Sequence, residues 1–178
     1  MKRTKKEKII FKNREYVYSI ACFLLMIDQL VKLLVRSKMP LLDEVEVLPG
    51  FFSIYHIKNS GAAFSLFSGS TLVLIILSIL VLFFLHYYVL TEEHMTKWRI
   101  FGFGIVIGGI IGNLVDRILY GAVIDYLSFH FFGYDFPIFN IADIGITFGF
   151  LIIAIGILRR DSNAFRSQSN DGARRKEN

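Results

Sequence analysis

The chain has 178 residues, of which 54% are hydrophobic and 15% aromatic, and its formal net charge is +5. Its mean hydropathy of +0.52 is high for a soluble domain, and the apolar residues gather in long stretches, which excludes a soluble globular protein and indicates a polytopic membrane protein. The basic residues concentrate at the two ends of the chain, as on the cytoplasmic flanks of membrane helices, so no nucleic-acid partner is expected.

Four apolar stretches each approach the roughly 20 residues that a membrane-spanning helix needs. We expect these helices at about 16–35, 71–90, 100–120 and 141–158. The polar link 91–99 contains several basic groups and suits a cytoplasmic turn, and an even number of spans places both termini on one side. The prediction is a single multi-pass membrane domain with cytoplasmic basic tails at 1–14 and 159–178, the second of them disordered after Arg160.

The segment between the first two spans does not have the pattern of a helix. VEVLPGFFSIYHIKNSGAAFSLF (45–67) combines β-branched and aromatic runs with breaks at Pro49-Gly50 and Ser60-Gly61. This pattern is typical of short strands, so we expect a small extracytoplasmic β-sheet at about 40–68, on the outer surface of the membrane. The break at Gly61 leads to the hypothesis that this segment covers the substrate and excludes water. The predicted fold class is an α-helical membrane protein with four transmembrane helices and a small outer sheet.

Two aspartates are predicted to meet at the outer end of the helices. At about 1.5 Å per residue, Asp143 lies roughly 24 Å from Arg159, just below the outer boundary of a hydrocarbon core about 30 Å thick. Asp125 follows the third span, where the chain leaves or skirts the same interface. We therefore assign Asp125 and Asp143 to the outer ends of the third and fourth helices, joined by a connection short enough to let them face one another.

Two carboxylates at one partly dry site cannot both ionise easily, so one is protonated while the other accepts a proton from water. Aspartic peptide hydrolysis requires this arrangement, because one group activates water and the other polarises the scissile carbonyl. A structural alternative is equally open, in which each aspartate caps a helix or pairs with a basic residue.

Other chemistries have less support in the sequence. No H-E-x-x-H motif occurs and Cys22 is the single cysteine, so no metal or organic cofactor is expected. A Ser–Lys dyad of Ser60 or Ser65 with Lys58 stays open, without specific support. A transporter that uses membrane carboxylates as relays is a further alternative, disfavoured by the nearly uncharged cores of the second and fourth spans.

Further charged residues in the spans are interpreted as ordering the site. Asp28 and Lys32 are four residues apart on the first span and are expected to form an intrahelical ion pair. Asp116 and Arg117 are interpreted as a fixed charged pair at the outer interface, either structural or substrate-orienting. The glycines of GGIIGNLVDR (108–117) predict a close approach of another helix.

Five motifs are similar, in their order along the chain, to those of bacterial lipoprotein signal peptidase, also called signal peptidase II. They are DQLVK (28–32), NSGAAFS (59–65), GGIIGNLVDR (108–117), GAVIDYL (121–127) and FPIFNIADIGI (136–146). The resemblance, over about residues 16–158, implies a membrane aspartic endopeptidase that removes signal peptides from prolipoproteins, cutting immediately before a cysteine that carries a diacylglyceryl group. It also implies a bacterial plasma-membrane location, an active site near the outer leaflet, contact with membrane lipid, and inhibition by globomycin-like cyclic peptides.

The resemblance also implies roles for individual residues. Asp125 and Asp143 match the catalytic dyad of the family. Substrate-binding or site-ordering roles are expected for Asn59, Gly61, Asn113, Asp116, Arg117, Asn140, Asp28 and Lys32. The chain departs from the family pattern at Val31, where a hydroxylated residue is frequent, and at Tyr126, where Phe is common. Neither departure affects the dyad.

Overall fold

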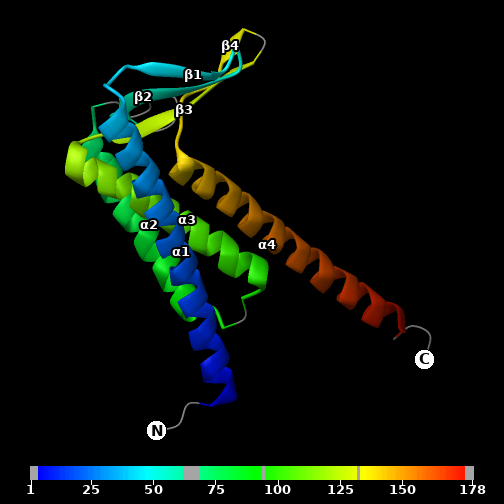
Figure 1. The fold of residues 1–178 in the computed structure, drawn as a ribbon. Helices are drawn as coiled ribbons and strands as arrows, with labels where there is room; N and C mark the ends of the chain where they lie inside the picture. Colours follow the sequence, from blue (N-terminus) through cyan, green and yellow to red (C-terminus); the bar gives the residue numbers. More distant parts are fainter. Residues whose placement is uncertain (1–3, 62–68, 94, 132, 175–178) are drawn as a thin grey trace.

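The structure is a computed structural model that describes residues 4–61, 69–93, 95–131 and 133–174. It consists of long helices with a small sheet at one end (Figure 1). The helices are α1 (Lys5–Lys38), α2 (Thr71–Thr91), α3 (Lys97–Tyr120) and α4 (Ile141–Arg174). In the described part of the chain, four helical stretches are long and apolar enough to cross a membrane: Ile10–Lys38, Thr71–Thr91, Lys97–Tyr120 and Ile141–Leu158. The predicted fold class of four transmembrane helices and a small sheet is confirmed.

Helix α3 forms the core of the helical part. The most apolar 18-residue stretch of α3 is 78% buried inside the protein. The corresponding stretch of α2 is only 11% buried, so the surface of α2 is mostly left to lipid. Glycines allow neighbouring helices to approach α3 closely on two sides, because a Cβ on Gly108 would lie 2.5 Å from the Ala21 carbonyl oxygen of α1. A Cβ on Gly109 would lie 2.5 Å from the Ala142 carbonyl oxygen of α4. The predicted close packing at these glycines is confirmed, and it holds α1, α3 and α4 together.

The sheet is antiparallel and is built from two distant parts of the chain. Its strands, in spatial order, are β1 (Glu44–Leu48), β2 (Phe52–Asn59), β3 (Val123–Phe131) and β4 (Tyr134–Asp135). The prediction placed the sheet only at 40–68 and so missed β3 and β4. The sequence VIDYLSFHF of β3 has the β-branched and aromatic composition of a strand, but its partner β2 lies far away in sequence. Within the predicted segment, residues 62–68 lie outside the described part of the chain.

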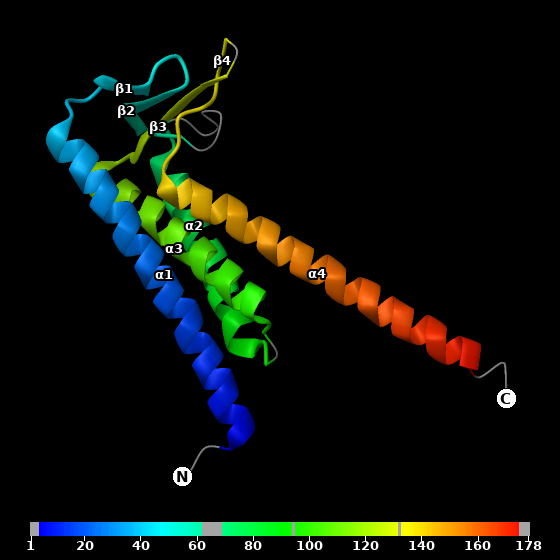
Figure 2. The ribbon, with the colours of Figure 1, turned by 45° about the vertical axis from the view of Figure 1, so that its right-hand side comes forward.

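Both outer helices are longer than the predicted spans. Helix α1 begins at Lys5, and α4 continues to Arg174, so the predicted disorder after Arg160 is wrong for residues 161–174. This stretch contains no proline and one glycine, so nothing in it breaks a helix already started by the apolar span. The first turns of α1 and the last turns of α4 both lie at the end opposite the sheet (Figure 2). The side of the membrane that this end faces stays a prediction.

Candidate active site

Asp125 lies on a strand and not at a helix end, which corrects the prediction. Helix α3 ends at Tyr120 because Gly121 adopts a left-handed conformation with φ 71°, and the chain then turns into β3. Asp125 is opposite Ile57 of β2 in the sheet register and is only 1% exposed. The missed strand therefore positions this carboxylate.

Two asparagine side chains hold the Asp125 carboxylate. Asn59 Nδ2 donates to Asp125 Oδ2 at 2.9 Å, and Asn140 Nδ2 donates to Asp125 Oδ1 at 2.6 Å. Burial, and after it the negative charge of Asp143, raise the pKa of Asp125 from 3.8 to about 7, although both asparagine hydrogen bonds act in the opposite direction. A group with such a pKa can exchange a proton near neutral pH.

Asp143 lies in the first turn of α4 and takes part in a reciprocal cap. The backbone N–H of Asp143 donates to Asn140 Oδ1 at 3.0 Å, and the backbone N–H of Asn140 donates to Asp143 Oδ2 at 3.2 Å. This is the pattern of a capping box, so Asp143 does have the structural role that the sequence left open. Its other oxygen, Oδ1, accepts a hydrogen bond of 2.8 Å from Asn113 Nδ2.

The two aspartates line one cavity of about 570 Å³ between the sheet and the helices. One part of its wall is polar and includes Asn59, Asn113 and Arg117 beside the two carboxylates. The remaining wall is largely apolar and comes from β3, from the segment before α4, and from α4 itself: Val123, Phe136, Pro137, Phe139, Ile144, Ile146 and Phe148. The cavity is therefore amphipathic, with both carboxylates at its polar part.

A buried charged cluster of three residues lies behind the cavity. Lys32 Nζ is 2.9 Å from Asp28 Oδ2 and 2.8 Å from Asp116 Oδ2, and none of the three side chains is more than 2% exposed. The predicted Asp28–Lys32 ion pair is confirmed. The predicted Asp116–Arg117 pair is wrong, because consecutive helical residues point in different directions and Asp116 turns to Lys32 instead.

The charged cluster supports both aspartates through backbone groups next to them. Asp28 Oδ1 accepts a hydrogen bond of 3.0 Å from the N–H of Ala142, which precedes Asp143. Asp116 Oδ2 accepts one of 3.2 Å from the N–H of Ile124, which precedes Asp125. Lys32 Nζ also donates to Asn113 Oδ1 at 2.8 Å, which turns the Nδ2 of that amide toward Asp143.

Sequence reasoning missed Gln29, which joins the same cluster. Its Nε2 lies 3.0 Å from Asp116 Oδ1, 3.3 Å from Asp28 Oδ2 and 3.1 Å from the Gly112 carbonyl oxygen. The position of Gln29 inside the DQLVK motif, between two residues assigned to the site, was the available signal.

Arg117 and Gly61 form a further part of the cavity wall. The Arg117 guanidinium donates to the Gly61 carbonyl oxygen at 3.0 Å, and the Gly61 N–H donates to Asn59 Oδ1 at 2.9 Å. The second bond determines the orientation of the Asn59 amide, because it leaves Nδ2 free to donate to Asp125. All ten predicted site residues thus lie in one continuous network at the sheet end of the helices.

The alternative nucleophile has no support in this arrangement. Neither Ser60 nor Lys58 lines the cavity, and Ser65 lies outside the described residues. Within the described ranges, no group of three or more His, Cys, Asp or Glu side chains is placed to hold a metal ion.

The comparison with known families decides the assignment. The family model for signal peptidase (SPase) II matches residues 20–159. The chain belongs to the signal peptidase II family. Lipoprotein signal peptidases from two strains of Staphylococcus aureus, JH9 and Newman, are each 37% identical to this signal peptidase II over 144 residues, which are 81% of this chain and 88% of each relative.

Two solved structures also match this signal peptidase II, both described as bacterial membrane enzymes determined by the in meso method. The first, at 2.3 Å, aligns with a TM-score of 0.77 and covers 83% of this chain and 90% of its own. The second, at 1.9 Å, aligns with a TM-score of 0.72 and covers 80% of this chain and 92% of its own. Each of the two structures is 35% identical to this chain in sequence. The resemblance found in the motifs is confirmed, and the chain is a bacterial membrane peptidase rather than a transporter.

Proposed function

We propose that Asp125 and Asp143 are the catalytic pair with which this signal peptidase II removes signal peptides from prolipoproteins. The observation that carries the proposal is that both carboxylates line the same cavity while separate asparagine amides hold each of them. A helix cap alone would not explain this arrangement, because the cap uses only one oxygen of Asp143 and does not involve Asp125.

The pair performs hydrolysis by sharing one proton. The raised pKa of Asp125 supports a state in which one carboxyl is protonated and the other ionised at neutral pH. The ionised group takes a proton from water as that water attacks the scissile carbonyl, and the protonated group donates a hydrogen bond to the carbonyl oxygen. The tetrahedral intermediate then breaks at the C–N bond, and a proton passes from the pair to the leaving amine.

The neighbouring polar residues keep the two carboxylates in place during this exchange. Asn59 and Asn140 donate to Asp125, and Asn113 donates to Asp143, so neither carboxylate can rotate freely in the cavity. Such preorganised donors stabilise negative charge without further rearrangement. Arg117 lines the same wall, and we assign it an orienting contact with the substrate backbone.

The amphipathic cavity supports a substrate that is part peptide and part lipid. We assign cleavage to the bond immediately before a diacylglyceryl-modified cysteine, whose acyl chains keep their far ends in the bilayer while the peptide enters the polar part of the cavity. Globomycin-like cyclic peptides are expected to occupy this cavity and to inhibit. The corresponding orientation has the sheet and the cavity at the outer leaflet of the bacterial plasma membrane and both termini in the cytoplasm.

The test uses a purified diacylglyceryl-modified prolipoprotein and the full-length protein in detergent. Wild type is compared with Asp125→Asn, Asp143→Asn and the control Asp43→Asn, whose side chain is exposed and lies outside the cavity. Wild type and the control are expected to cut before the lipidated cysteine, while each variant of the pair loses at least about 10²-fold in rate. Normal cleavage by folded Asp125→Asn and Asp143→Asn would make both aspartates structural.

A further inference from the structure

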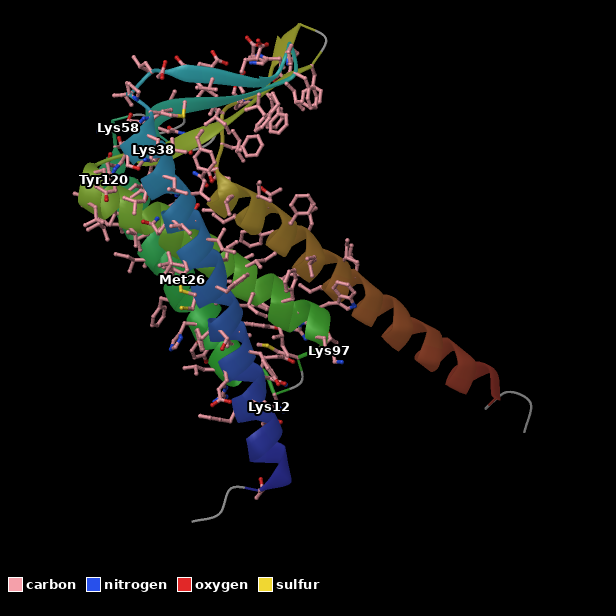
Figure 3. All side chains as sticks on the ribbon, in the orientation of Figure 1. Lys12, Met26, Lys38, Lys58, Lys97 and Tyr120 are labelled. Atoms are coloured by element: carbon pink, nitrogen blue, oxygen red, sulfur yellow. The ribbon has the colours of Figure 1, made fainter. Side chains whose placement is uncertain are left out.

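One side of the sheet carries a group of phenylalanine rings that the mechanism does not use. We call it the aromatic face, and it consists of Phe51, Phe52, Phe129, Phe131, Phe136 and Phe139. Adjacent rings have centroids between 4.8 and 6.1 Å apart, so they form one continuous layer. Aromatic rings gather below the sheet, on the side of the helices (Figure 3).

The aromatic face lies on the same side of the sheet as the catalytic pair. Side chains alternate along a strand, so Phe129 and Phe131 project from β3 to the side of Asp125. Phe52 of β2 is opposite Phe129 in the sheet register, and their rings stack at 4.8 Å. The sheet therefore presents a polar half near Asp125 and an aromatic half toward the far end of β3.

The aromatic face is also continuous with the cavity. Phe136 and Phe139 line the cavity, and the Phe139 ring stacks on Phe129 at 5.7 Å. A molecule in the cavity could therefore extend along the rings without crossing a polar barrier. Three residues of the aromatic face are nevertheless accessible to solvent: Phe51 is 41% exposed, Phe131 43% and Phe136 47%.

We propose that the aromatic face binds the acyl chains of the substrate's diacylglyceryl group, an inference that rests on the proposed function. The reason is geometric, because Asp125 lies on the sheet and the scissile bond must rise to it. The lipid is attached to the residue next to that bond, so the first carbons of its chains leave the hydrocarbon layer together with the peptide. The aromatic face covers these carbons with apolar surface where water would otherwise meet them.

Two substrates that differ only in acyl length test this assignment. One carries two palmitoyl chains and the other two butyryl chains on the same lipidated peptide, and KM and kcat are measured for both in the same detergent micelles. The variants are Phe129→Ala and Phe131→Ala, whose rings do not line the cavity, and the second replaces a 43% exposed ring at the end of β3. Phe23→Ala is the control, because Phe23 is a 62% exposed ring on α1.

For the long-chain substrate, the two variants are expected to raise KM about 4-fold to 15-fold and to leave kcat unchanged. This rise in KM corresponds to the loss of one to two buried methylene groups, at about 0.8 kcal/mol each. For the short-chain substrate, KM should match that of wild type, and the control should match wild type throughout. An equal rise in KM for both substrates would assign the rings to the bilayer or to sheet stability and overturn the inference, as would unchanged KM values.

Failure of the inference can be separated from failure of the proposed function by including Asp125→Asn. If wild type cleaves, Asp125→Asn does not, and the ring variants show no dependence on acyl length, only the acyl site is wrong. If wild type does not cleave the lipidated substrate at all, both proposals fall.

Discussion

Replacing Asp125 with asparagine is expected to abolish cleavage and to stabilise the fold increasingly as the pH rises. Burial, and then the charge of Asp143, raise the pKa of Asp125 from 3.8 to about 7 in the folded protein. An aspartate with a raised pKa destabilises the fold in the range where the unfolded chain has already released its proton. This penalty is absent below pH 3.8, grows between pH 3.8 and about 7, and is complete above that range. Asparagine does not titrate and therefore removes it.

The size of the effect follows from the two pKa values. As the pH rises from about 5 to about 8.5, the unfolding free energy of Asp125→Asn is expected to increase by about 3 kcal/mol relative to that of wild type. A pH-independent loss opposes this gain, because Asn59 and Asn140 both donate to the carboxylate and asparagine has one acceptor oxygen. One amide then loses its partner at about 1–3 kcal/mol. The change with pH is the quantity that tests the argument.

Thermal unfolding in detergent, followed by the fluorescence of the single tryptophan, Trp98, measures this change. The difference in Tm between variant and wild type should grow on the order of 5–10 °C from the lower to the higher pH. Asp43→Asn, at an exposed position, should show no such growth. A Tm difference that is the same at both pH values would refute the raised pKa of Asp125 and weaken the shared-proton mechanism.

Three further substitutions test the support of the site. Lys32→Met leaves two buried carboxylates without their cation and is expected to destabilise the fold by about 3–5 kcal/mol. The measurement is a lower Tm, and an unchanged Tm would contradict the role of the cluster. Gly109→Ala places a Cβ against the Ala142 carbonyl, so α3 and α4 must separate; we expect a loss of about 1–3 kcal/mol together with lower activity, and full activity would argue against tight packing here. Tyr126→Phe removes the hydroxyl that accepts a hydrogen bond of 3.3 Å from the Ile141 N–H. The Tm should fall by the equivalent of about 1 kcal/mol while kcat is retained. A large loss of kcat would show a catalytic role for the hydroxyl.

Local patterns were sufficient to predict the helices and part of the charged cluster. The spans follow from apolar runs, and the Asp28–Lys32 pair follows from a spacing of four residues on one helix. The close packing at Gly108 and Gly109 likewise follows from small residues within one motif. Each of these features depends on residues that are near one another in the chain.

Features that depend on distant pairings could not be predicted in the same way. Strand β3 was missed because it pairs with β2, whose Asn59 is 66 positions from Asp125. The partner of Asp116 was predicted wrongly because Lys32 comes from another helix, and Gln29 gave no local sign of the three groups it contacts. The motif resemblance was sufficient to name most site residues, but not the strand that carries Asp125.

The wide separation of these partners also determines when the protein can become active during its synthesis. Asp28 and Lys32 neutralise each other within α1, so the first helix can enter the bilayer without a lone charge, which would cost about 2.5–3.5 kcal/mol at the helix centre. Asp28 meets the Ala142 N–H 114 positions later, and the Asp125 carboxylate meets Asn140 only at the start of the last helix. A nascent chain on the ribosome therefore lacks the complete network around the proposed catalytic pair until its final helix has been inserted.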